Sequence, residues 1–264
     1  MSKSHSNGKT ILFVGTVALI CSLMLSAAAT VLKDRQEANV RLDMQKNILT
    51  ALGMVAGSGA EPAAVYDGKL TQLPHGPGAA AVEALFAEGG HVQGIAVDGF
   101  GKVVTLPEGT TVADLIAEEE KLKAPAKMRL PVYVLFGESA SEPLAYAVPI
   151  EGKGLWSTLY GFIALDGDLN TVKGITFYKH GETPGLGAEV TNPDWQAQWP
   201  GEKILNEEGE LVSILVQKGG SNPDDPHAVD AISGATMTSD GVTHFLKADL
   251  ALFEPYFNTI RKGN

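Results

Sequence analysis

The stretch LPVYVLFGESASEPLAYAVPIEGKGLWSTLYGFIALDGDLNTVKGITFYKH, residues 130–180, decides the fold. It contains four apolar or alternating runs, at 131–137, 144–150, 159–167 and 172–180, separated by turn residues. Runs of this kind are typical of β-strands, and Asp166-Gly167-Asp168 marks a hairpin turn between two of them. We therefore expect consecutive strands that pair in a mainly antiparallel sheet.

A further predicted strand, 211–219, and a final helix follow these runs. The helix begins after Met237 and carries one apolar face, and Lys247 and Asp249 lie outside that face. Its apolar face consists of Val242, Phe245, Leu246, Leu250 and Phe253. Because the strands come first and the helix last, rather than in βαβ repeats, the sequence predicts an α+β fold with flanking helices. We assign residues 130–264 to one domain.

The segment before this domain reads as a stalk followed by a connection. Residues 33–55 predict a helical stalk, with an apolar residue at every fourth position from Val40 to Leu52 through Met44 and Ile48. The Gly-, Ala- and Pro-rich stretch 56–80 predicts a loop. A short helix at 80–88, a strand at 92–99 and an acidic helix at 111–124 follow, and we interpret 56–129 as an insertion or a subdomain.

Residues 11–32 contain no charged side chain. A helix of this length spans roughly 33 Å, enough to cross a hydrocarbon core of about 30 Å. A cleaved signal peptide is the alternative, because Ala27-Ala28-Ala29 looks like a cleavage site, but the run exceeds the usual apolar region of about 7–15 residues. We predict an uncleaved transmembrane helix after a cytoplasmic tail, residues 1–10. The lysines and arginines around it permit this orientation without deciding it.

The composition limits the classes of function. The net charge is −11, and both charges in residues 1–32 are positive, so the rest of the chain is strongly acidic and unsuited to nucleic acid. The single cysteine, Cys21, excludes an intrachain disulfide and a CxxC redox pair. Phosphate-loop, HExxH, GxSxG and complete dinucleotide motifs are absent, and the histidines lack ligand spacing. We predict no catalytic side chain and no metal site within this chain alone, so any redox function needs a bound cofactor; a metal centre that Cys21 shares with partner subunits is the alternative.

The turn DAISGATMTSD, residues 230–240, leads into the final helix and is rich in small and hydroxyl side chains. The free amides and the dipole of a helix N-terminus suit a phosphate, and Gly234 and Ala235 let the backbone approach a ligand closely. The alternative is a helix cap, in which Thr238, Ser239 or Asp240 accepts hydrogen bonds from first-turn amides. A cap leaves the SGAT residues themselves unexplained.

Two glycine motifs complete the candidate site. KHGETPGLGAE, residues 179–189, follows a predicted strand; its glycines permit positive φ and Pro184 stiffens it, although a plain surface connection is the alternative. GKGLW, residues 152–156, ends in Trp156, which is either a core residue or a flat wall for a planar ligand. The three motifs together describe a phosphate site beside a loop that admits an aromatic ring.

These motifs resemble those of the FMN-binding domain family. The D-x-x-S-G-A-T pattern at 230–236 resembles the flavinylation motif, in which the last threonine carries FMN through a phosphoester bond. GxGLW at 152–156 and ETPGLG at 182–187 look like its companion motifs. With the N-terminal span, the order is similar to that in the family of C subunits of the Na⁺-translocating NADH:quinone reductase. The G subunit of the Rnf electron-transport complex is a close relative, but it is typically shorter and lacks much of a segment like 56–128.

The resemblance implies one covalent FMN per chain, attached to Thr236 by a separate flavin transferase. It places Ser233, Gly234 and Ala235 at the phosphate, and Thr183, Leu186 and Gly187 near the ring, with Trp156 as a wall. It further implies an electron-relay component, single-pass in the bacterial inner membrane with its soluble domain in the periplasm. Membrane lipid and the other subunits, which pump sodium, are then its partners. A membrane-anchored assembly protein without redox activity is the alternative.

Overall fold

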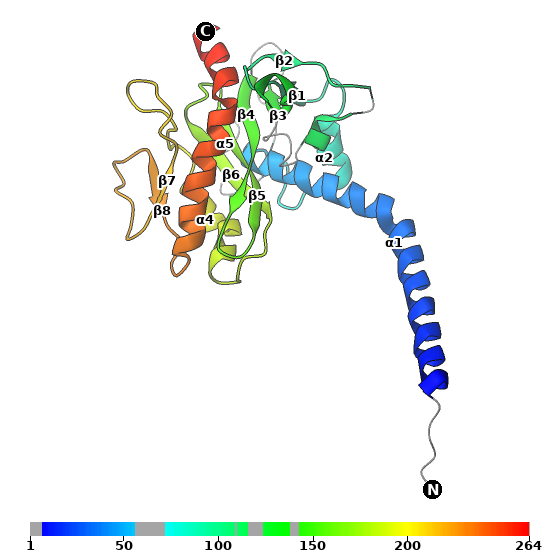
Figure 1. Cartoon of the computed structure of the whole chain (residues 1–264). Helices are drawn as coiled ribbons and strands as arrows, with labels where there is room; N and C mark the ends of the chain where they lie inside the picture. Colours follow the sequence, from blue (N-terminus) through cyan, green and yellow to red (C-terminus); the bar gives the residue numbers. More distant parts are fainter. Residues whose placement is uncertain (1–6, 56–71, 109, 116–123, 138–142, 264) are drawn as a thin grey trace. The chain divides into compact units, whose positions relative to one another are not determined.

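The computed structural model describes residues 7–55, 72–108, 110–115, 124–137 and 143–263 (Figure 1). These residues form two units, 1–42 and 43–264. Helix α1, Asn7–Ala51, begins in the first unit, where Gly8–Lys33 is long and apolar enough to cross a membrane and buries none of its residues. The expected N-terminal apolar helix is thus confirmed.

The end of α1 belongs to the second unit and is fixed by its termination signal. Gly53 has a φ of 71°, and the Met54 N–H donates to the Leu49 carbonyl over 2.8 Å while the Gly53 N–H donates to the Thr50 carbonyl over 3.1 Å. This pair of bonds is the Schellman arrangement that glycine permits after a helix. Of the predicted stripe, Ile48 and Leu52 are fully buried, whereas Val40 is exposed.

The second unit is built on a six-stranded antiparallel sheet in the order β2-β1-β3-β4-β5-β6. Its strands are β1 Val92–Val97, β2 Val103–Val104, β3 Leu130–Phe136, β4 Pro143–Lys153, β5 Thr158–Asp166 and β6 Val172–Lys179. The strands expected at 92–99, 131–137, 144–150, 159–167 and 172–180 are therefore confirmed. Strands β1 and β2 extend the same sheet, so the boundary that we placed at 129/130 falls within it.

Short elements connect and flank the sheet. They are α2 Ala79–Phe86, η1 Val112–Leu115, η2 Pro125–Lys127, η3 Gly187–Thr191 and α4 Pro193–Gln196. The helix α2 corresponds to the one expected at 80–88. Of the acidic helix expected at 111–124, the structure describes only η1 and the residues next to it, and most of the loop expected at 56–80 also lies outside the described residues.

The strand predicted at 211–219 is wrong in extent. Only β7, Leu215–Gln217, is extended, and it pairs in parallel with β8, Ala228–Asp230. Ser213 takes a φ of 68°, a left-handed conformation that interrupts a strand. Both the Val212 and the Ser213 N–H donate to the Ile204 carbonyl, so this stretch turns instead of continuing.

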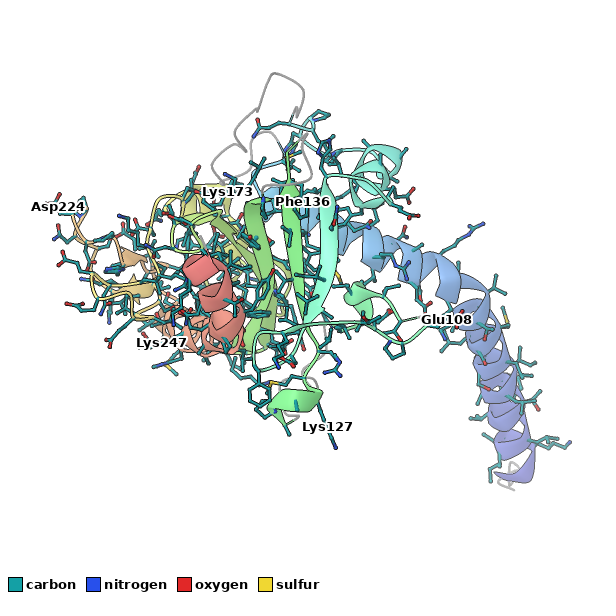
Figure 2. The ribbon with its side chains drawn as sticks, turned by 90° about the horizontal axis from the view of Figure 1, so that it is seen from above. Glu108, Lys127, Phe136, Lys173, Asp224 and Lys247 are labelled. Carbon is teal, nitrogen blue, oxygen red and sulfur yellow. The ribbon has the colours of Figure 1, made fainter. Side chains whose placement is uncertain are left out.

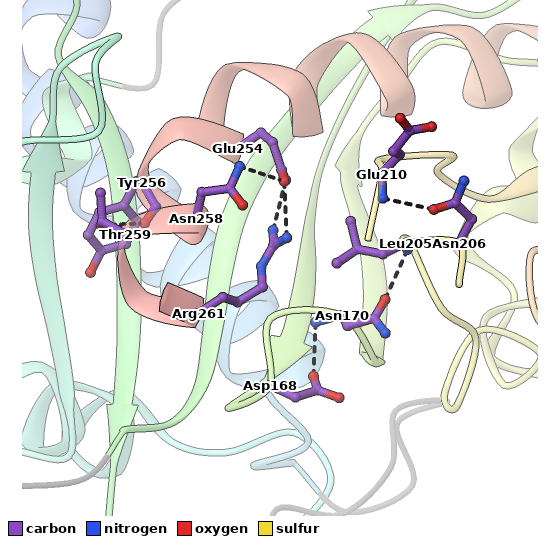
Figure 3. A network of polar contacts seen from close by, with 10 residues as sticks. All are labelled: Asp168, Asn170, Leu205, Asn206, Glu210, Glu254, Tyr256, Asn258, Thr259 and Arg261. Carbon is purple, nitrogen blue, oxygen red and sulfur yellow. Dashed lines mark hydrogen bonds and ion pairs between the residues drawn. The ribbon is translucent and has the colours of Figure 1, made fainter. Parts of the chain in front are cut away.

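The hairpin turn between β5 and β6 is confirmed and is tied to a distant segment. The Asp168 carboxylate accepts from the Asn170 N–H over 2.9 Å, and the Asn170 side chain accepts from the Leu205 N–H over 2.9 Å (Figure 3). This turn lies at the end of the sheet where β3 ends and β6 begins, near the labelled Phe136 and Lys173 in Figure 2. The predicted motifs at 152–156 and 182–187 lie at the opposite end of the sheet, where β4 and β6 end.

Helix α5, Thr236–Gly263, covers one face of the sheet and contributes seven buried apolar residues to the core (Figure 1). All five predicted apolar positions are buried, from Val242 to Phe253. Asp249 is a correction: it is buried, and its carboxylate accepts the Glu151 N–H over 2.6 Å, because β4 lies against this side of the helix. On the other face, the Thr176 hydroxyl donates to the Asn47 carbonyl of α1 over 3.2 Å.

Two glycines let α5 approach β4 closely. A Cβ on Gly241 would collide with the Lys153 carbonyl oxygen, and a Cβ on Gly152 would collide with the Phe245 side chain. The first turns of α5 therefore rest directly on the end of β4. This contact sets the position of the helix N-terminus, and with it that of Thr236.

Gly241→Ala tests this contact. Alanine normally stabilises a helix interior by about 1 kcal/mol relative to glycine, but here the added methyl group overpacks the contact with β4. We expect the free energy of unfolding to fall by about 1–3 kcal/mol, measured by denaturant unfolding of the full chain in detergent. Gly263→Ala, near the end of the same helix with open space around it, is the control and should not destabilise the protein. Equal effects of the two changes would contradict the close approach.

Candidate functional site

The three predicted motifs meet at one end of the sheet. Residues 152–156 form the hairpin between β4 and β5, closed by a 2.9 Å bond from the Gly154 N–H to the Ser157 carbonyl. Residues 182–187 follow the end of β6, which lies beside the start of β5. The turn 230–235 leads into α5, whose first turns rest on the end of β4. The antiparallel order of the strands thus brings together segments that are far apart in the sequence.

The Glu182 carboxylate joins the three motifs. Its oxygens accept hydrogen bonds from the backbone N–H groups of Leu155, Trp156 and Ser157 over 3.2, 3.0 and 2.9 Å. They also accept from the Ser157 hydroxyl over 3.1 Å and from the Thr238 hydroxyl in the first turn of α5 over 2.8 Å. Glu182 is buried, so these donors take the place of water around its charge.

These bonds determine the ionisation of Glu182. Burial by itself raises the pKa of a carboxyl group, but the Thr238 hydroxyl and the Trp156 and Ser157 N–H groups stabilise the charged form more. The net result is a pKa below the usual range of glutamate. The sequence analysis passed over Glu182; the signal for it was an acidic residue inside a glycine-rich loop directly after an apolar strand.

Glycines next to Glu182 make room for it. A Cβ on Gly154 would lie 2.8 Å from one Glu182 oxygen, and a Cβ on Gly187 would lie 2.6 Å from the other and 2.7 Å from the Thr238 hydroxyl. Larger residues at either position would push the carboxylate away from its donors. The predicted site residue Gly187 is thus buried against the carboxylate.

The turn before α5 also contacts the loop that follows β6. Gly234 has a φ of 74°, and the Ala235 N–H donates to the Ile232 carbonyl over 3.0 Å, which closes a four-residue turn with Ser233 and Gly234 exposed at its tip. A Cβ on Gly234 would lie 2.9 Å from a methyl group of Leu186. The structure therefore places Leu186 directly against the SGAT turn.

The helix-cap interpretation of this turn is wrong. Thr238 donates to Glu182, and the Ser239 hydroxyl accepts from the Ile232 N–H, which precedes the helix. Within the described part of the chain, no side chain accepts from the Thr236, Met237 or Thr238 amides, and the Thr236 hydroxyl has no hydrogen-bond partner. These groups are the unpaired donors that an anion binds at a helix N-terminus.

Apolar side chains surround this polar centre. Leu155, Trp156, Leu186 and Met237 are 50%, 72%, 42% and 61% exposed. The core interpretation of Trp156 is therefore wrong, because the hairpin projects it into solvent. Thr183 is exposed as well, and its carbonyl accepts from the Leu186 N–H over 3.1 Å. The first residue of the motif that contains SGAT, Asp230, is structural: its carboxylate accepts from the backbone and hydroxyl of Ser221 over 2.6 and 2.8 Å.

Known proteins are similar in sequence to this chain over its full length. The C subunit of the Na(+)-translocating NADH-quinone reductase of Vibrio anguillarum is 36% identical over 267 residues, covering 99% of this chain and 98% of its own. The C subunit of the same reductase from Pseudomonas aeruginosa is also 36% identical, over 100% of this chain and 99% of its own. Residues 154–251 match the FMN-binding domain family.

This chain belongs to the family of C subunits of the Na⁺-translocating NADH-quinone reductase. The crystal structure of NqrC from Shewanella oneidensis matches 83% of the chain and 96% of its own, with a TM-score of 0.62 and 29% identity. The expected α+β fold and the choice of the quinone reductase over the Rnf complex are thereby confirmed.

The described residues of this member of the NqrC family fit FMN. A phosphate group finds unpaired amides at the start of α5 and exposed backbone at Ser233 and Gly234. A planar ring finds exposed apolar side chains on both neighbouring loops, at Trp156 and Leu186. Glu182, the carboxylate that joins the three motifs, already accepts hydrogen bonds from its own donors, so it does not compete for those amides.

The change Glu182→Gln tests the carboxylate network. The amide keeps the shape but turns one acceptor into a donor that faces other donors, so we expect a loss of about 1.5–3 kcal/mol in the free energy of unfolding at pH 7. Since the folded-state pKa of Glu182 is lowered, its contribution is complete above the unfolded value of about 4.3 and is lost as the pH falls through the folded value. Urea unfolding from pH 7 to pH 3 measures this, and a pH-independent difference between the proteins would contradict it.

Proposed function

We propose that this chain carries FMN attached by a phosphoester bond to the Thr236 hydroxyl and relays electrons within the quinone reductase complex. The observation that carries the proposal is that, among the described residues, no hydrogen bond involves the Thr236 hydroxyl or the first-turn amides of α5. Bound FMN would supply the reversible electron chemistry, and the protein supplies attachment, orientation and electrostatics.

The residues of the site divide between the two ends of the cofactor. Ser233, Gly234 and Ala235 shape the phosphate end, because the turn exposes Ser233 and Gly234 and buried Ala235 joins them to Thr236. Thr183, Leu186, Gly187 and Trp156 lie on the loops that flank that turn and are proposed to contact the ring. Leu186 lies against Gly234. Its side chain therefore joins the loop proposed to contact the ring, residues 182–187, to the turn proposed to bind the phosphate.

Attachment of the flavin needs a second protein. A threonine hydroxyl is a weak nucleophile, and no histidine, lysine or carboxylate of the described residues is hydrogen-bonded to Thr236. We propose that a flavin transferase supplies the base. The Thr236 oxygen then attacks the phosphorus on the FMN side of FAD, its proton passes to that base, and the pyrophosphate bond breaks with release of AMP.

The proposed location is the bacterial inner membrane, with one helix across it and the soluble domain in the periplasm. The exposed apolar segment Gly8–Lys33 supports the single crossing. Covalent attachment supports the orientation, because a cofactor that dissociated outside the cytoplasm could not readily be replaced. Sodium passes through partner subunits, since among the described residues of this span no acidic or basic side chain lies between Ile11 and Leu32.

Thr236→Val tests the attachment. After co-expression with the transferase, we expect the wild-type chain to gain one FMN by intact mass and to fluoresce after denaturing electrophoresis, and the variant to do neither. Thr259→Val, the same change near the other end of α5, is the control and should keep the adduct. An adduct on Thr236→Val, or none on the wild type with an active transferase, would overturn the proposal and leave an assembly role.

Leu186→Ala tests the ring contact separately from the bond. Removing the side chain opens the space against Gly234, so we expect a changed flavin absorption spectrum and reduction potential while the covalent adduct is retained. Leu215→Ala, a similarly exposed leucine on β7, is the matched control. An unchanged spectrum and potential in Leu186→Ala would show that this side chain does not contact the ring.

A further inference from the structure

The Glu182 carboxylate is a fixed negative charge inside the candidate site. It receives five hydrogen bonds, four from the β4–β5 hairpin and one from Thr238. Three of these partners are backbone N–H groups, which can only donate, and both hydroxyls also donate, an arrangement that favours the ionised carboxylate. Its lowered pKa agrees with this geometry.

No cation neutralises this charge within the described part of the chain. The ion pairs Lys33–Glu37, Lys173–Asp166 and Arg261–Glu254 do not involve Glu182, and no other cationic side chain of the described residues forms an ion pair with it. Among the described residues, the groups bonded to this charge are N–H and O–H dipoles of the hairpin and of the helix turn that flank Thr236. Since Glu182 is buried, water screens it weakly.

We propose that Glu182 is a positioning residue that fixes the three loops of the flavin site and whose charge lowers the reduction potential of FMN on Thr236. This inference rests on the proposed function. Reduction adds negative charge to a flavin, and a fixed anion nearby opposes that step by Coulomb repulsion. The same carboxylate therefore fixes the three loops and lowers the reduction potential of the flavin. A neutral hydrogen-bond acceptor could not have the second effect.

A comparison of two buried carboxylates separates charge from structure. Glu182→Gln neutralises the proposed charge, whereas Asp249→Asn neutralises a carboxylate that is equally buried and also accepts a backbone N–H from β4. Asp249 lies 13 residues beyond Thr236 on α5, about 20 Å along the helix. Both changes should reduce stability, but only the first should act on the flavin.

The measurement is a redox titration of the full chain in detergent, followed by flavin absorbance. It uses protein whose single FMN adduct has been confirmed by denatured mass. We expect Glu182→Gln to favour reduction about tenfold, an upward shift of about 30 mV for a two-electron couple, and Asp249→Asn to leave the potential at the wild-type value. No shift, a downward shift, or equal shifts in both variants would overturn the inference.

Thr238→Val provides a second test that does not depend on the folding of Glu182→Gln. It removes one donor but leaves the carboxylate ionised by the remaining bonds, so the charge is less well balanced and the potential should fall. If the two changes acted only by loosening the loops, the reduction potentials of Glu182→Gln and Thr238→Val would shift in the same direction. A raised or unchanged potential in Thr238→Val would contradict the inference. An absence of the adduct from the wild type would instead overturn the proposed function, and this inference with it.

Discussion

A buried carboxylate must keep hydrogen-bond donors around it, and this requirement organises the functional end of the protein. Glu182 can remain ionised only while the β4–β5 hairpin and the first turn of α5 both direct donors at it. Its loop, the hairpin and the helix therefore cannot move independently. Gly154 and Gly187 have no side chains to obstruct this convergence. The position of Thr236 follows, because it lies two residues before Thr238 on the same helix.

The packing of α5 on the sheet supplies the second constraint. Gly152 and Gly241 remove the side chains that would separate the helix from β4, and Asp249 then binds the backbone of β4 at Glu151. The helix is thus held along its length by apolar contacts and at several points by polar ones, among them those of Thr238, Thr243 and Asp249. Among the described residues no hydrogen bond is accepted from the amides of its first turn, while its apolar face is buried. The proposed attachment at Thr236 would place the cofactor on a rigid element, which would suit electron transfer because the distance to the next centre would depend on that position.

The sequence allowed the strands and the final helix to be predicted because alternating and helical periodicity record which face is buried. Prediction from the sequence failed where the structure depends on a single backbone conformation or on a partner that is distant in the chain. Ser213 breaks a strand by adopting positive φ, which its apolar neighbours do not indicate. Asp249 is polar yet buried, because the Glu151 N–H lies opposite it. The site motifs were recognised from glycines and hydroxyls, but Glu182 was not, because its donors come from a hairpin 25–27 residues earlier and a helix 56 residues later.

The way in which α1 ends bears on where the chain can be shortened. The helix closes with Gly53, and the last turn before it inserts Ile48, Leu49 and Leu52 into the folded domain with no exposed surface. Helix α1 thus runs from the apolar segment into the second unit, and its final turn serves that unit as a core element. A fragment designed to begin after residue 55 would leave a hollow in place of these side chains, whereas one that begins near Asp43 keeps them. Proteolytic release of the domain from the membrane would preserve its fold only by cutting on the N-terminal side of that turn.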